Sequence, residues 1–135
     1  MTSASDSTLN RIAAAGLLAG AGFGLGGTLV TSPDLQASLW AIDGVALVIA
    51  TSLLTLKYSR AGSEIVSAEF LVFAIGEGVL LSGTAAGPRG SVPAFAAGTA
   101  LWSPLPFFAY PFLVATLLGW AWKLLREAEA RPDGT

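Results

Sequence analysis

The stretch IVSAEFLVFAIGEGVLLS, residues 65–82, decides the fold class, because it is apolar apart from two glutamates and nearly long enough to cross a bilayer. A helix needs about 20 mostly apolar residues to span the hydrocarbon core. A second stretch of the same kind, LWAIDGVALVIATSLLTL, residues 39–56, contains Asp43. A charge at bilayer depth costs at least about 2.5–3.5 kcal/mol, so such residues normally face a protein interior, a water-filled cavity or a partner. Asp43, Glu69 and Glu77 are therefore the candidate site residues, for a proton, a cation or a polar ligand.

The composition supports a lipid-embedded chain. Of 135 residues, 53% are hydrophobic and 12% are charged, whereas soluble domains carry about 25% charged residues. The chain has no cysteine and no histidine, which removes disulfides, thiolate chemistry and the commonest metal ligand. It also has no basic patch suited to nucleic acid. We therefore expect one integral membrane domain over residues 1–135 that is not an enzyme and uses no cofactor or metal.

Apolar segments divide the chain into four expected spans, at about residues 12–30, 39–56, 65–82 and 105–125. The first is interpreted as a retained helix rather than a signal peptide, because no clear small-x-small cleavage site precedes Pro33. Residues 83–93 are rich in glycine and proline and predict a loop. Residues 94–102 predict a short interfacial or re-entrant helix before the last span.

The basic residues predict the orientation. On a four-span arrangement all but Arg89 fall on one side, and these are Arg11, Lys57, Arg60, Lys123, Arg126 and Arg131. Cytoplasmic loops carry the excess of lysine and arginine. The predicted fold class is thus an all-α, four-span transmembrane helix bundle with both termini cytoplasmic, in the cell's inner or plasma membrane. The last of these helices is expected to project into the cytoplasm as a solvated end.

Glycines predict a helix-packing interface on the first segment. Gly16, Gly20 and Gly24 repeat a small-xxx-small spacing, which lets helix backbones approach closely. Gly27 falls on the same side at 100° per residue. Leu18, Leu25 and Leu29 lie roughly opposite. This interface can lie within one subunit or between subunits.

The other two carboxylate-bearing segments have distinguishable faces. Asp43 shares a face with Leu47, Ala50, Thr51 and Leu54, and Glu77 shares one with Phe70 and Phe73, so both carboxylates are expected to point inward. In antiparallel helices Asp43 and Glu77 fall at similar depth, roughly 6 Å into the outer half of the bilayer. Glu69 lies nearer the cytoplasmic end, where pairing with Lys57 or Arg60 and snorkelling to the interface are both open.

Two functional interpretations follow. In the first, a non-enzymatic membrane protein assembles with itself or with a membrane-protein partner through the glycine-rich helix, and Gly20→Leu or Gly24→Leu breaks assembly. In the second, a small proton- or cation-coupled transporter or channel is centred on Asp43 and Glu77. Two nearby carboxylates in a low dielectric cannot both ionise cheaply, so the pair is expected to share a proton. A protonated carboxyl can equally be a hydrogen-bond link between helices.

Overall fold

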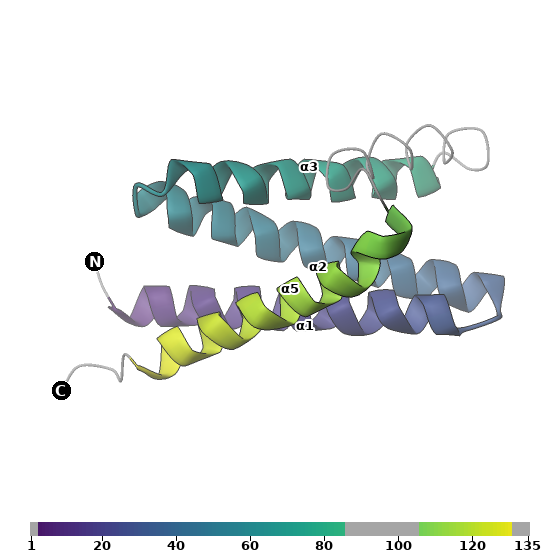
Figure 1. Ribbon diagram of the computed structural model, residues 1–135, viewed down its shortest axis with the longest axis horizontal. Coiled ribbons are helices and arrows are strands. Elements are labelled where there is room, and N and C mark those ends of the chain that lie inside the picture. The colour runs from purple at the N-terminus through teal and green to yellow at the C-terminus, as the bar shows by residue number, and fades with distance from the viewer. Residues whose placement is uncertain (1–2, 86–105, 131–135) are drawn as a thin grey trace.

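The computed structural model describes residues 3–85 and 106–130, which form four helices (Figure 1). They are α1 (Ser3–Leu29), α2 (Pro33–Arg60), α3 (Glu64–Ala85) and α5 (Pro106–Glu129). Three stretches within them, Asp6–Leu29, Pro33–Arg60 and Glu64–Gly83, are long and apolar enough to cross a membrane. This architecture is consistent with a helical membrane protein. The predicted short helix at residues 94–102 lies outside the described residues.

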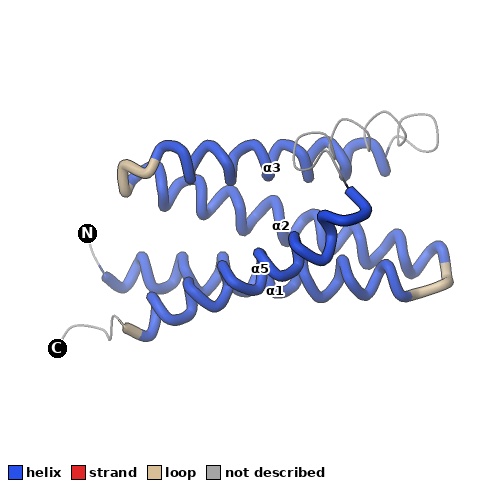
Figure 2. The backbone as a smooth tube through the Cα atoms, in the orientation of Figure 1, coloured by secondary structure: helices blue, strands red, loops and turns tan. Residues whose placement is uncertain are grey.

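Two short turns connect the first three helices (Figure 2). Ser32 precedes α2 in an extended conformation, and Pro33 follows it at the first helical position, where a missing N–H costs nothing. At the other end of α2, Gly62 has φ +72°. The Gly62 N–H donates to the Ser59 carbonyl and the Ser63 N–H donates to the Tyr58 carbonyl. This is a Schellman motif, which satisfies the last carbonyls of α2 and reverses the chain into α3.

The helices pack in a chain of neighbours, with α1 against both α2 and α5, and α2 also against α3. One cluster of buried side chains joins α1, α2 and α5, and it includes Leu17, Leu54 and Leu124. At one end of the bundle, α1 begins, α2 ends, α3 begins and α5 ends (Figure 1). We call this the basic end, since it carries Arg11, Lys57, Arg60, Lys123 and Arg126.

Burial confirms which side of α2 points inward, and on α3 residues on the side opposite Glu77 are exposed. On α2, Gly44, Leu47, Ala50, Thr51 and Leu54 are buried. Val45 and Ile49 on the opposite side are exposed, as are Leu71, Val72 and Ile75 on α3. The leucines expected opposite the glycines of α1 are also exposed, namely Leu18, Leu25 and Leu29.

The two ends of the chain are more deeply packed than their polarity indicates. The helix α1 begins at Ser3, nine residues before the expected span, and its polar residues Ser7 and Asn10 are buried. The expectation of a solvated projection at the end of α5 is wrong for Leu124 and Ala128, which are both buried. The physical reason is that α1 and α5 pack against each other, so small residues on α5 are covered by the start of α1.

Candidate functional site

The glycines of α1 pack against α2 of the same chain. A β-carbon added at Gly16 would lie 2.9 Å from the Ala50 β-carbon and 3.0 Å from the Ala46 carbonyl oxygen. One added at Gly20 would lie within 2.6 Å of the Leu47 side chain, and one at Gly27 would meet the Trp40 ring. Gly24 is buried as well. The absence of side chains is therefore what allows α1 to approach α2 so closely.

This close approach brings α1 up to Asp43. The Asp43 Oδ1 atom would lie 3.3 Å from a β-carbon at Gly20. On the neighbouring residue, a β-carbon at Gly44 would lie 2.8 Å from Leu81 Cδ2, so α3 also approaches α2 closely here. Sequence reasoning missed the role of Gly44, although the adjacent Asp-Gly pair within an apolar segment is the signal that marks it. The carboxylate thus sits on α2 between two close helix contacts.

Glu77 lies across from Asp43 on α3. Its residue is 6% exposed, and its carboxylate interacts electrostatically with that of Asp43. Within residues 3–85 and 106–130, neither carboxylate forms an ion pair. The two ion pairs found in this part of the chain both involve Glu127. The structure therefore brings together two carboxyl groups, one buried and one half-buried, without a paired cation in the described part of the chain.

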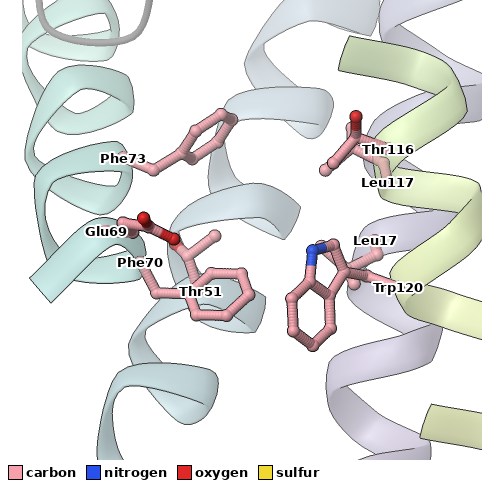
Figure 3. Close-up of a pocket in the computed structure, with 8 residues that line it drawn as sticks. All are labelled: Leu17, Thr51, Glu69, Phe70, Phe73, Thr116, Leu117 and Trp120. Carbon is pink, nitrogen blue, oxygen red and sulfur yellow. The ribbon is translucent and has the colours of Figure 1, made fainter. Parts of the chain in front are cut away.

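Glu69 lies elsewhere, at a cavity between α3 and α5. The cavity has a volume of about 190 Å³. Side chains from α3 and α5 extend into it from opposite sides, and those of Thr51 and Leu17 lie behind them (Figure 3). Its lining comprises Leu17, Thr51, Glu69, Phe70, Phe73, Thr116, Leu117 and Trp120. Glu69 and Glu77 are eight residues apart on one helix, so these two carboxylates are separated by about 12 Å along α3. Phe73, which also lines the cavity, lies midway between them.

Of the two alternatives open for Glu69, pairing with Lys57 or Arg60 is not found within the described chain. Lys57 Nζ instead donates to Glu127 Oε2 at 2.6 Å, joining the end of α2 to the end of α5. Lys123 Nζ lies 3.9 Å from the other oxygen of Glu127. Glu127 therefore partly neutralises both lysines of the basic end that lie near the cavity.

A cluster of three rings adjoins the cavity and holds two of its lining residues in place. Phe70 and Tyr58 are stacked, with centroids 5.8 Å apart, and Trp120 meets Phe70 edge to face at 5.1 Å. Tyr58 and Trp120 also meet edge to face at 5.6 Å. The contact of Trp120 with α3 could not be found from the sequence, because no local pattern links positions that are fifty residues apart.

Comparison with known proteins gives no match to a protein family, to a curated protein or to a solved structure. The fold, with its three helices of sufficient length and apolarity, supports the class of transmembrane helical proteins. The carboxylate pair and the cavity are the features that bear on a narrower function.

Proposed function

We propose that the protein is a four-span membrane protein that handles protons or small cations at Asp43 and Glu77. The observation that carries this proposal is the buried Glu77 carboxylate facing Asp43 with no cation paired to either in the described chain. Two like charges in a low-dielectric interior repel each other, and a bound proton or metal cation relieves that repulsion. Intramembrane carboxylates in such surroundings are typical of proton relays and ion pathways.

The side-chain hydrogen bonds of the described chain favour this proposal over a purely structural role. A structural carboxyl would need a hydroxyl or amide partner on a neighbouring helix. Within residues 3–85 and 106–130, none of the side-chain hydrogen bonds that join one helix to another engages Asp43 or Glu77. Thr51, on the same face of α2 as Asp43, lies about 12 Å away along the helix and donates to the Leu47 carbonyl at 2.6 Å.

Assembly through the glycine-rich helix is the weaker candidate for a main function. Gly16, Gly20 and Gly27 already pack against α2 of the same chain, so that face is not free for a second subunit. Self-association remains part of the proposal for another reason, since four helices enclose little space for a transport pathway. A contact between copies would then use other surfaces, such as the exposed leucines of α1.

The proposed topology places both termini in the cytoplasm. It is supported by the gathering of basic residues at one end of the bundle, as the positive-inside rule requires for a cytoplasmic side. Because the chain has no cysteine, single cysteines can report the topology. An impermeant maleimide applied to intact cells should label Ser91→Cys, in the predicted outer loop, and leave Thr135→Cys unlabelled. The reverse pattern, or labelling of both, contradicts this arrangement.

Proteoliposomes with an imposed pH gradient test the function. Wild type, Glu77→Gln and Asp43→Asn are reconstituted at equal levels, with Glu64→Gln as the control because Glu64 is an exposed carboxylate at the start of α3. Wild type and the control should dissipate the gradient, and Glu77→Gln should not. A parallel series with imposed Na⁺ or K⁺ gradients separates proton from cation movement. Absence of flux in wild type under every gradient, or full flux in Glu77→Gln, refutes the proposal.

A further inference from the structure

We propose that the cavity between α3 and α5 binds a small organic cation, of which the trimethylammonium group is the type. Glu69 supplies the opposite charge, and the rings of Phe73 and Trp120 contact the apolar surface of the ligand. This site is distinct from the Asp43 and Glu77 pair, and its occupancy does not depend on whether that pair moves ions.

Glu69 places a carboxylate at the cavity. Glu69 is the one charged residue of the lining, and within the described chain no side-chain hydrogen bond or ion pair engages it. Lys57, one of the two basic residues considered as its partner, is bound to Glu127 instead. In Figure 3 the Glu69 carboxylate points from α3 toward the space in front of Thr51. An anionic group at the mouth of an otherwise apolar cavity favours a cation as the ligand.

Aromatic rings form part of the wall of the cavity. Phe70, Phe73 and Trp120 all line the cavity, and aromatic faces attract cations through the ring quadrupole, with tryptophan the strongest. Trp120 already accepts one cation, since Lys123 Nζ lies 4.7 Å from its ring centroid. Stacking with Tyr58 holds Phe70, and the edge contact with Phe70 holds Trp120. A site with rings held in place loses less conformational entropy when a ligand binds.

Size and shape decide the class of cation. A volume of about 190 Å³ falls below the roughly 300 Å³ at which drug-sized sites begin. The lining is mainly apolar, with hydroxyls only from Thr51 and Thr116. Thr51 donates its hydroxyl hydrogen to a backbone carbonyl. A strongly hydrated inorganic ion would find few oxygen ligands here, whereas an alkylammonium group presents carbon atoms to the rings and charge to Glu69.

Two charges near the cavity, on Glu69 and on Lys123, are expected to change the affinity for a cation in opposite directions. Lys123 lies over Trp120, and its own charge opposes a cation in the cavity, although Glu127 at 3.9 Å reduces that effect. The charge of Lys57 is neutralised more fully, because its Nζ lies 2.6 Å from the Glu127 carboxylate. Removal of the Glu69 charge should therefore weaken cation binding, and removal of the Lys123 charge should strengthen it.

Choline is the probe, and its neutral analogue, in which a carbon atom replaces the nitrogen, is the matched control for shape. Equilibrium binding is measured on the full chain in phosphatidylglycerol nanodiscs, with empty nanodiscs subtracted. Wild type should bind choline at least about tenfold more tightly than the neutral analogue. Glu69→Gln should weaken choline binding about tenfold, Lys123→Met should tighten it several-fold, and Glu64→Gln should leave it unchanged.

A second variant guards against an effect of folding. Phe73→Leu keeps an apolar side chain but removes the ring, so it should weaken choline and leave the neutral analogue unaffected. Folding of every variant is checked by circular dichroism. Equal binding of choline and its analogue, no choline binding in wild type, or unchanged binding in Glu69→Gln overturns the proposal.

Repeating the measurement in phosphatidylcholine nanodiscs identifies the source of the cation. If a lipid headgroup occupies the site, free choline will bind more weakly there than in phosphatidylglycerol, and the difference will vanish in Glu69→Gln. If the ligand is a free cation, the two bilayers will give the same affinity in wild type. Both results support the site, and the flux experiment on Glu77 can fail or succeed independently of them.

Discussion

Substitution of Gly20 by alanine tests how closely α1 and α2 pack. The added β-carbon would lie 2.4 Å from Leu47 Cδ2 and 2.6 Å from Leu47 Cγ, whereas non-bonded carbons prefer about 3.5–4.0 Å. Leu47 is 2% exposed, so its side chain has no free space into which to rotate. The helices must separate by about 1 Å at this point to reach that separation. Overpacking of this kind costs about 1–3 kcal/mol.

Helix propensity favours alanine over glycine and so opposes the packing cost. Its contribution to the free energy of unfolding therefore has to be subtracted. Alanine is favoured over glycine in a helix by about 1 kcal/mol. Gly22→Ala supplies the control, because a β-carbon there meets nothing within 4 Å and the residue lies on the same helix. The difference between the two variants isolates the packing cost, and we expect Gly20→Ala to be less stable than Gly22→Ala by about 1–3 kcal/mol.

Reversible unfolding in mixed detergent micelles, followed by far-ultraviolet circular dichroism, measures this difference. Both variants are titrated with denaturing detergent under identical lipid conditions, and free energies of unfolding are compared at equal composition. Equal stability of Gly20→Ala and Gly22→Ala would show that Leu47 is not held against α1, and the reasoning about the glycine face would then be wrong.

Three further substitutions probe the described contacts in the same unfolding assay. Gly27→Ala would place a β-carbon 2.4 Å from the Trp40 ring, but Trp40 is 46% exposed and can swing outward, so we expect a loss below about 1 kcal/mol; a loss of about 3 kcal/mol contradicts this. Lys57→Met removes the 2.6 Å bond to Glu127, whose partners are partly exposed, so stability should fall by at most about 1 kcal/mol and less at high salt. A loss independent of salt would assign the effect to packing instead. Gly62→Ala places a β-carbon on a residue with φ +72° and should cost about 1 kcal/mol, with Gly62→Asn less costly; equal stability of all three chains would argue against the left-handed turn.

Much of the helical arrangement could be predicted because its signals are local. Each expected span corresponds to a helix, and the faces of α2 and α3 follow from which side carries the charged residue. Val45 and Ile49 are exposed while Leu47 and Ala50 are buried, as a period of 3.6 residues requires. Asp43 alone is enough to orient α2, because a carboxylate in lipid is so costly. On α3, which carries two carboxylates, Glu77 is buried and Glu69 is exposed.

The contacts of Lys57 and the lining of the cavity could not be predicted, because the residues involved come from distant parts of the chain. The bond between Lys57 and Glu127 joins residues 70 positions apart. The lining of the cavity combines Glu69 with Trp120, and no spacing rule connects them. The burial of Asn10 was likewise not predicted, because it depends on the packing of α1 against other helices.

The amino-acid sequence alone was sufficient to predict that the chain forms apolar helices, which sides of α2 and α3 are exposed, and that carboxylates lie within them. These properties depend on the transfer free energy of each residue and on the helical period, which act locally. The tertiary structure was needed to show that Glu69 lines a cavity together with Trp120, and that the glycines of α1 are covered by α2 of the same chain. The physical reason is that these contacts arise from how whole helices pack, and packing depends on the shapes of surfaces that lie far apart in the sequence.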